Sequence, residues 1–538
     1  MPATSRPNIV LILVDDMGYS DIGCYGGEID TPNIDRLAAQ GVRFSQFYNA
    51  GRCSPSRASL LTGLHPHQTG IGVLTKNDLA HGGYPGSLNQ DCVTIAEVLQ
   101  DVGYATCLAG KWHLVSDVQH PNDAWPTRRG FDEFFGTLQG SSSYFQPGSL
   151  TRGEVNVESE AVGDFYYTDA ITDFACDFVR RAGGGSKPFF LYTAYTAPHW
   201  PLHAPEADVA RYRGRFDEGW DVLRERRIER LYASGILDGT AALSARDPTQ
   251  PAWPDAADKA WELRRMEVYA AQVERMDRGV GRIVSALEAA GQCENTLVMF
   301  LSDNGACAEP LPLDGDADAF VRHRPYLRRL RPRNGRELRV GNYPSIMPGG
   351  DDTFASYGRS WANLSNTPFR FYKRWTHEGG VATPLVVHWP EGGLIDGSIV
   401  RDPLQLTTVM PTLLEVAGAT HPASRHGRPV LPPEGSSFLP ALRGKVQDAA
   451  TLYWEHTGNA AIRDGRWKLV REFPHPWELY DMTVDRSETR DLAAANPEVV
   501  RQLGHSWHDW AARVGVIPWD AVLAGYRQAG KPEDEAAG

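Results

Sequence analysis

Gly51-Arg52-Cys53-Ser54-Pro55-Ser56-Arg57-Ala58-Ser59-Leu60-Leu61-Thr62-Gly63 reads as a junction between a strand and a helix. Before it, residues 42–48 alternate apolar and polar side chains, which is typical of a strand. After the cysteine, Ser-Pro-Ser suits a first helical turn, and Gly63 would end the helix. Cys53 would then lie at a helix N-terminus, where unpaired backbone N–H groups favour negative charge.

Arg57 follows Cys53 by about one helical turn and would face the same place. The stretch therefore predicts an anion site that contains a sulfur atom. The alternative is a buried structural cysteine, because a lone Cys most often packs as a small apolar side chain.

The motif Cys-x-Pro-Ser-Arg-x-x-Leu-Leu-Thr-Gly, which begins at Cys53, resembles the signature of the type I sulfatase family, in which this cysteine is oxidised to formylglycine. A second signature of that family is similar to Gly103-Tyr104-Ala105-Thr106-Cys107-Leu108-Ala109-Gly110-Lys111-Trp112-His113. The resemblance runs from Asn8 to about residue 500, and within the family the chain is most similar to the bacterial arylsulfatases.

Continuous apolar runs such as 8–14 and 296–301, separated by helical patterns, predict an α/β protein with buried strands. The resemblance implies an alkaline-phosphatase-like fold: a large mixed sheet flanked by helices, plus a smaller C-terminal α+β domain with a short antiparallel sheet. A change to Pro- and Gly-rich composition near Pro422 predicts a catalytic domain over residues 1–421 and the smaller domain over residues 422–538.

Five predicted strands are each followed by residues that can carry chemistry. In open α/β sheets, ligands bind beyond the carboxyl ends of strands, so these residues are expected to converge. The alternative is a set of unrelated polar turns. The residues are Asp15, Asp16, Cys53, Lys111, His113, His199, Asp303 and Asn304.

Asp15, Asp16, Asp303 and Asn304 offer oxygen ligands only, which suits a hard cation such as calcium. No His or Cys has the spacing of a zinc site. The resemblance implies that these four residues and residue 53 bind one divalent cation, usually Ca²⁺.

The resemblance also implies a mechanism. Hydrated formylglycine at Cys53, with Asp303 as base, attacks sulfur and forms a sulfoenzyme, while His199 protonates the leaving oxygen. His113 then takes the proton of the second hydroxyl, and sulfate is expelled. The charge of the sulfate is offset by the cation and by Arg57, Lys111 and Lys373.

The sequence thus predicts an enzyme that hydrolyses sulfate monoesters, with aryl sulfates as the expected substrates. Two alternatives stay open: a phosphonate or phosphate ester hydrolase of the same superfamily, and a non-catalytic calcium-binding paralogue that keeps Cys53 as a thiol. The retained Lys111, His113, His199 and Lys373 favour sulfate ester hydrolysis.

Charge and composition restrict the partners. The formal net charge of −13 argues against nucleic-acid binding, and the apolar run 9–14 is too short to span a membrane. Residues 1–7 have no apolar core of a signal peptide, and the seven cysteines form no disulfide framework, so a reduced, cytoplasmic protein is expected. The expected partners are a small sulfate ester and the formylglycine-generating machinery, and a homo-oligomer is left open.

Two polar segments, 205–262 and 308–365, read as insertions. The second contains an arginine-rich run from Arg322 to Arg339, which we interpret as a solvated face or a subunit contact rather than a substrate contact. Residues 114–160 read as loops, residues 266–290 as a long helix, and residues 404–417 as another helix.

Overall fold

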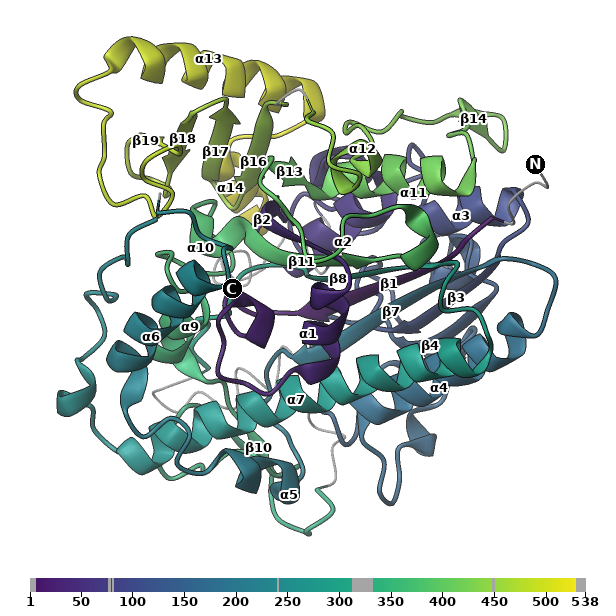
Figure 1. Cartoon of the computed structure of the whole chain (residues 1–538), viewed down its shortest axis with the longest axis horizontal. Helices are drawn as coiled ribbons and strands as arrows, with labels where there is room; N and C mark the ends of the chain where they lie inside the picture. The colour runs from purple at the N-terminus through teal and green to yellow at the C-terminus, as the bar shows by residue number, and fades with distance from the viewer. Residues whose placement is uncertain are drawn as a thin grey trace.

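A large mixed sheet forms the centre of the molecule (Figure 1). The computed structural model describes residues 6–75, 79, 82–239, 241–311, 332–447 and 450–528. The sheet has the strand order β12-β2-β11-β8-β1-β7-β3-β4-β5-β6, and β13 also pairs with β2. Its strands are β1 (Asn8–Asp15), β2 (Val42–Tyr48), β3 (Ala105–Gly110), β4 (Glu133–Thr137), β5 (Leu150–Arg152), β6 (Val155–Asn156), β7 (Phe189–Pro198), β8 (Thr296–Ser302), β11 (Ala382–His388), β12 (Ile399–Val400) and β13 (Leu404–Gln405).

The direction of the central strands decides what meets at each edge of the sheet. β1 runs parallel to β7 and β8, and β7 runs parallel to β3. β11 is antiparallel to both β8 and β2, so β2 runs in the same direction as β8. The carboxyl ends of β1, β2, β3, β7 and β8 therefore lie at the same edge as the beginning of β11.

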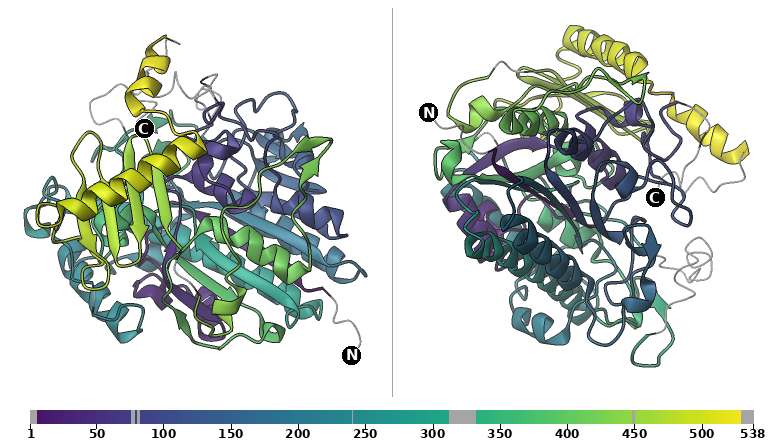
Figure 2. Two further views of the ribbon diagram at one scale, coloured as in Figure 1. Left: turned by 90° about the horizontal axis from the view of Figure 1, so that it is seen from above. Right: turned by 90° about the vertical axis from the view of Figure 1, so that its right-hand side faces the viewer.

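Helices cover both faces of this sheet (Figures 1 and 2). Because side chains on successive strand residues point to opposite faces, each strand contributes alternate residues to two separate cores. Val10, Ile12 and Val14 of β1 pack in the same core as α1 (Pro32–Ala39), α4 (Tyr167–Gly183) and α7 (Lys259–Ala289). Ile9, Leu11 and Leu13 face the other core, with α2 (Cys53–Thr62), α3 (Ile95–Asp101) and α11 (Val409–Ala417).

A four-stranded antiparallel sheet stands beside the large one (Figure 1). One face of the small sheet packs with α13 through Ile462, Leu469 and Trp507, and the other face contributes Ala461 and Val470 to the core of the large sheet. Its elements are β16 (Leu452–His456), β17 (Asn459–Asp464), β18 (Trp467–Arg471), β19 (Glu478–Asp481), α13 (Pro497–Val514) and α14 (Trp519–Gln528).

Apart from 3-10 turns, the other helices and strands of the described residues are short or belong to connections. They are the helices α5 (Glu206–Val209), α6 (Gly219–Ala233), α9 (Gly358–Ser365), α10 (Glu378–Val381) and α12 (Leu439–Leu442), the pair β9 (Arg339–Val340) and β10 (Thr353–Phe354), and the pair β14 (Ser424–Arg425) and β15 (Arg428–Pro429).

The predicted fold class is confirmed: a large mixed sheet flanked by helices, with a smaller α+β unit that contains an antiparallel sheet. The helix predicted over residues 404–417 is wrong in its first part. Leu404 and Gln405 pair with Phe47 and Tyr48 of β2, a 3-10 turn follows, and the α-helix begins only at Val409. The division at residue 421 stays a prediction, and the small sheet begins at Leu452.

The segments predicted as insertions and loops contain more regular structure than their composition indicates. α6 lies within 205–262, and its Arg227 is buried in an ion pair with Asp21 at 2.8 Å. Residues 114–160 contain β4, β5 and β6. Of the run from Arg322 to Arg339, residues 322–331 lie outside the described residues, and Arg339 pairs with Asp352 at 3.0 Å.

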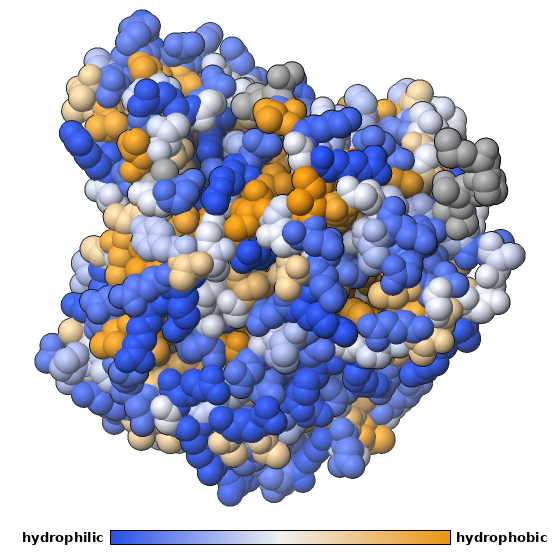
Figure 3. Space-filling model, viewed as in Figure 1, coloured by the Kyte–Doolittle hydropathy of each residue, from blue (hydrophilic) through white to orange (hydrophobic). Residues whose placement is uncertain are grey.

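Polar side chains cover most of the face shown in Figure 3, and apolar side chains appear on it in scattered groups. None of the described helices is both long enough and apolar enough to cross a bilayer.

Candidate active site

Helix α2 begins at Cys53 itself, one residue after the extended Arg52. It ends at Thr62, and the next residue, Gly63, has a left-handed backbone (φ 70°) and donates its N–H to the carbonyl of Ser59. All ten residues of α2 are buried, and Cys53 is 3% exposed. The predicted helix and its glycine stop are confirmed, and the thiol lies at the helix N-terminus.

Arg57 links Asp303 to the backbone of Lys111 through three hydrogen bonds. Its Nε and Nη2 donate to Oδ2 of Asp303 at 3.0 and 2.7 Å, and its Nη1 donates to the carbonyl of Lys111 at 3.0 Å. The other oxygen of Asp303 accepts the backbone N–H of Asp16 at 3.2 Å. Arg57 thus ties the ends of three strands (β1, β3 and β8) to the helix that carries Cys53.

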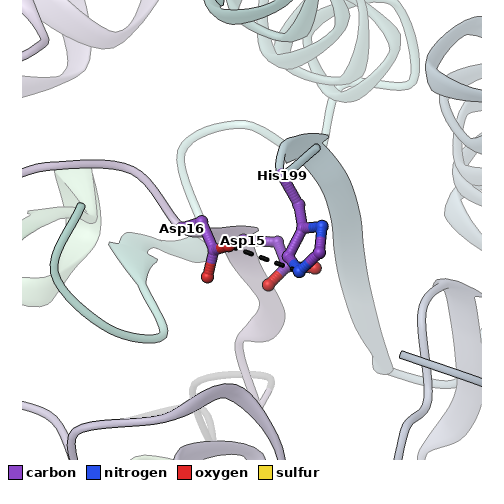
Figure 4. A group of neighbouring side chains, drawn as sticks. All are labelled: Asp15, Asp16 and His199. Atoms are coloured by element: carbon purple, nitrogen blue, oxygen red, sulfur yellow. Dashed lines mark ion pairs between the residues drawn. The ribbon is translucent and has the colours of Figure 1, made fainter. Parts of the chain in front are cut away.

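Asp15, Asp16 and His199 gather where β1 and β7 end (Figure 4). One potential ligand atom from each of the three lies within 4.8 Å of the others, which is compact enough for a metal ion. His199 Nε2 is 3.3 Å from Oδ2 of Asp16, and Lys111 Nζ is 2.5 Å from Oδ2 of Asp15. The imidazole is an addition to the oxygen ligands expected from the sequence.

Asn304 completes this group. Its Nδ2 donates to Oδ1 of Asp16 at 2.7 Å, and its own Oδ1 is buried. Within the described part of the chain, neither Oδ1 of Asn304 nor Oδ1 of Asp15 has a hydrogen-bond partner. Buried oxygen atoms are rarely left without a partner. Two such atoms beside a cluster of carboxylates fit the ligands of a hard cation.

Lys373 reaches the same place from the loop before β11. Its Nζ lies 3.0 Å from Oδ2 of Asp16 and 3.5 Å from Nε2 of His199. The neighbours Phe371 and Arg374 have left-handed backbones (φ 65° and 91°), a conformation that is uncommon for residues other than glycine. Because β11 is antiparallel to β8, this loop lies at the edge where the carboxyl ends of the other strands meet.

His113 also has a left-handed backbone, with φ 56°. A Cβ placed on Gly140 would fall 2.5 Å from both Cε1 and Nε2 of the imidazole, so Gly140 leaves room for the ring. Burial and the charges of Lys111 and Arg57 hold the pKa of His113 well below its usual value. The ring is therefore neutral and able to accept a proton.

The remaining groups also have shifted pKa values. Burial and the nearby charge of Asp15 raise the pKa of Asp303 to about 7, despite Arg57. Burial raises the pKa of the Cys53 thiol, although Lys111 and Lys373 oppose this shift. Burial also lowers the pKa of His199, against the opposing effect of Asp16.

The structure brings all the residues predicted for the site into one cluster at the edge of the sheet. The sequence did not indicate three further neighbours: Arg52, Trp200 and Glu309. Glu309 accepts from Arg52 Nη2 at 2.7 Å and from Trp200 Nε1 at 3.0 Å. Burial raises the pKa of Glu309, but Lys373 and Arg52 outweigh it and bring the value to about 2. Arg52 precedes Cys53 and Trp200 follows His199, and this adjacency is the sequence feature that could have indicated them.

Three comparisons with known proteins agree with this arrangement. Residues 7–419 match the family model described as Sulfatase, and residues 369–509 match the one described as N-sulphoglucosamine sulphohydrolase, C-terminal. An uncharacterized sulfatase of Schizosaccharomyces pombe is 33% identical over 547 residues, which cover 96% of this chain and 95% of that protein. An arylsulfatase of Klebsiella aerogenes is 34% identical over 456 residues, covering 80% and 91%. Among solved structures, Ps i-CgsB in complex with k-i-k-neocarrahexaose has a TM-score of 0.68 at 26% identity and covers 99% of both chains.

Proposed function

The chain belongs to the sulfatase family, and from this premise we propose that it hydrolyses aryl sulfate monoesters through a formylglycine formed from Cys53. Hydrolysis of sulfate esters is the activity that family membership supports. The aryl substrate, the modified residue and the cation are the further parts of the proposal, and each has its own support.

The position of Cys53 is the observation that carries the proposal. Its side chain lies at the start of a helix, within the electrostatic reach of Lys111 and Lys373 and beside the carboxylates Asp15 and Asp303. A sulfate monoester is an anion that repels nucleophiles, so a nucleophile for it needs cationic neighbours that offset the charge developing on the sulfate. Residue 53 has such neighbours.

A divalent cation, which we propose to be Ca²⁺, would be held by Asp15, Asp16, Asp303 and Asn304. The buried Oδ1 atoms of Asp15 and Asn304, which accept no hydrogen bond within the described residues, support this ligand set. When bound, the cation supplies positive charge that neutralises sulfate oxygens in the transition state. Lys111 and Lys373, which pair with Asp15 and Asp16 in the structure, would add to that charge.

An aldehyde at residue 53 supplies, in its hydrated form, an oxygen nucleophile that can later release sulfate without a second attack on sulfur. Asp303 is the carboxylate that we propose accepts the proton of that nucleophile. Arg57 fixes the orientation of Asp303 through two hydrogen bonds to one oxygen.

The two histidines are suited to opposite proton transfers. His199 Nδ1 donates to the carbonyl of Trp200 at 2.5 Å, because a carbonyl oxygen can only accept. Its Nε2 faces Lys373 and Asp16, and in the imidazolium form, with a second proton on Nε2, it would protonate the leaving oxygen. His113 is held neutral by burial and by Lys111, which is the protonation state that a base needs, and we propose that it accepts the proton that is lost when sulfate is released.

The aryl substrate is proposed from the similarity to the arylsulfatase of Klebsiella aerogenes. A sulfated sugar is the second candidate, since the similar Ps i-CgsB was solved in complex with k-i-k-neocarrahexaose. Both classes are monoesters of sulfate, so the same site chemistry would serve either of them.

The test combines mass spectrometry with an assay of released sulfate. The protein is produced together with a formylglycine-generating enzyme, and the peptide that contains Cys53 is weighed. We expect a loss of about 18 Da, the change from –CH₂SH to –CHO, and release of sulfate from 4-nitrophenyl sulfate. An active protein with an unmodified thiol would contradict the proposed nucleophile.

Matched substrates separate the alternatives. A converted residue 53 with release of 4-nitrophenol from the phosphonate or phosphate ester, and not from the sulfate ester, would favour the phosphonate or phosphate ester hydrolase. Calcium binding without turnover of any ester would favour the non-catalytic paralogue. Release of sulfate from sulfated sugars in preference to aryl sulfates would replace the aryl proposal by the sugar proposal.

A further inference from the structure

Glu309 contacts three residues of, or next to, the candidate active site: Arg52, Trp200 and Lys373. Its Oε1 lies 2.7 Å from Arg52 Nη2 and 3.6 Å from Lys373 Nζ, and its Oε2 accepts from Trp200 Nε1 at 3.0 Å. Arg52 directly precedes Cys53, and Trp200 directly follows His199. A single carboxylate thus contacts neighbours of the nucleophile, the proton donor and a sulfate-binding lysine.

Glu309 is also the member of this group that reaches solvent. Its side chain is 25% exposed, whereas Arg52, Trp200 and Lys373 are buried. The sulfate would lie inward, beside Cys53 and Lys373. The rest of a substrate extends outward from the sulfate, so the part close to the ester bond would pass Glu309.

The carboxylate is fixed in place. Trp200 packs its ring on His199 with centroids 4.6 Å apart, and on Phe354 with centroids 5.8 Å apart. Trp200, Phe354, Cys307, Leu311 and Val340 form a buried apolar cluster behind it. Two hydrogen bonds and the apolar cluster behind Trp200 hold the carboxylate of Glu309 in one place at the rim of the site. The side chain of Glu309 is therefore already ordered before a substrate binds.

We propose that Glu309 makes the site selective for sulfate esters whose remaining part carries no second negative charge. The inference rests on the proposed function and names the substrate class of the same site: neutral or cationic alcohols and phenols esterified with one sulfate. The fixed carboxylate of Glu309 would repel a second negative charge that passes it and would attract a positive one.

The charge of the rim gives a clear expectation for substituted phenyl sulfates. A carboxylate in the meta position carries a second negative charge close to the ester bond, while a carboxamide at the same position has similar size without charge. A trimethylammonium group there would be attracted. One unit charge at a partly exposed site changes binding by about a factor of ten.

The first experiment uses the wild-type holoenzyme alone. The value of kcat/KM is measured for 3-carboxyphenyl, 3-carbamoylphenyl and 3-(trimethylammonio)phenyl sulfate at low and high ionic strength. Salt screens exposed charges, so we expect added salt to raise the ratio of the carboxyl to the carbamoyl substrate and to lower that of the ammonio substrate. Ratios that do not respond to salt, or that change in the opposite direction, would overturn the proposal.

The second experiment compares Glu309→Gln with the wild type on the same three substrates. The variant can also disturb Lys373, but such an effect is common to all three substrates and cancels in their ratios. We expect the ratio of carboxyl to carbamoyl kcat/KM to rise about tenfold and the ratio of ammonio to carbamoyl to fall. The change should lie mainly in KM. Unchanged ratios in a folded variant would overturn the proposal.

Glu154→Gln is the matched control, because Glu154 is also a partly exposed glutamate that accepts from an arginine, Arg128, at 2.7 Å. It should leave all three ratios unchanged. The failure of the proposed function has a different signature: no sulfate is released from any of the three esters by the wild type. Sulfate release without charge preference would refute the role of Glu309 alone.

Discussion

Lys468 of β18 donates to Glu378, the first residue of α10, at 2.9 Å, and both side chains are fully buried. The same ammonium group lies 2.8 Å from Glu488, and Arg486 approaches Glu378 at 3.3 Å. α10 follows the loop that carries Lys373 and precedes β11. The small C-terminal sheet therefore fixes the end of a loop that belongs to the candidate active site.

Replacement of Lys468 by methionine should destabilise the protein by about 3–5 kcal/mol, because two buried carboxylates would lose the cation that they share. Denaturant unfolding followed by circular dichroism measures this change. Lys445→Met, at an exposed position, is the control and should unfold like the wild type. Equal unfolding free energies for Lys468→Met and the wild type would show that the buried pair contributes nothing.

Gly140→Ala should reduce kcat about 10- to 100-fold with little change in the melting temperature. The new methyl group would overlap the imidazole of His113 and move it from its position, and a displacement of about 1 Å in an active site can cost a factor of 10². Gly184→Ala is the control, since the nearest atom to its added Cβ is 3.9 Å away. Steady-state kinetics check this expectation, and full activity of Gly140→Ala would refute it.

Removal of divalent cations should abolish sulfate release, and Ca²⁺ should restore it. Binding to the folded state should also raise the free energy of unfolding, by about 2.7 kcal/mol at a calcium concentration one hundred times the Kd. Calorimetric titration of the cation-free protein gives the Kd without reference to activity. Asn304→Ala should weaken binding because it removes the buried Oδ1. An identical melting temperature with and without calcium would argue against the site.

His203 should make the protein sensitive to acid. Its Nε2 donates to the carbonyl of Thr353 at 2.6 Å, and its Nδ1 accepts from the backbone N–H of Tyr144 at 3.4 Å. A second proton on Nδ1 would break the hydrogen bond from the N–H of Tyr144. Burial also disfavours the charged ring and lowers the pKa of His203 to about 4. The unfolded chain binds a proton near pH 6.5, so stability is full above that value and falls as the pH decreases from 6.5 to 4.

His203→Gln keeps a donor and an acceptor but does not titrate. Its unfolding free energy, measured at a series of pH values, should fall less steeply between pH 6.5 and 4 than that of the wild type. Protonation of His203 should account for about 3 kcal/mol of the decrease in unfolding free energy between pH 6.5 and 4. His120→Gln, at an exposed position, should not alter the slope. Identical slopes for His203→Gln and the wild type would show that His203 has the same pKa in the folded and the unfolded chain.

The sequence predicted elements best where a local pattern and the tertiary contacts agree. The run Asn8–Val14 is apolar at every residue after Asn8 because both faces of β1 are covered, and α2 has both its start and its glycine stop in the motif. Leu404 fits the apolar pattern of the following helix, but the edge of β2 gives Leu404 and Gln405 strand partners instead. A local pattern contains no information about such an edge.

The residues of the candidate site also fall into those that a local pattern predicts and those that it does not. Asp15, Cys53, Lys111 and Asp303 follow strands that run in one direction, so the rule for strand ends brings them together. Lys373 precedes its strand and was predicted only from the family resemblance; the antiparallel direction of β11 explains its presence. Gly140 and Glu309 depend on what they contact across the fold, and no residue pattern near them indicates it.

The antiparallel direction of β11 also has a consequence for protein synthesis. During translation Asp15 and Cys53 are synthesised early, whereas Lys373 follows only after about two thirds of the chain. Lys468, which binds Glu378 in the segment after Lys373, is synthesised later still. A nascent chain that has folded the first strands still lacks a cation beside Asp16 and His199. We therefore expect the reactive cluster to be completed at a late stage of folding, when the small sheet docks.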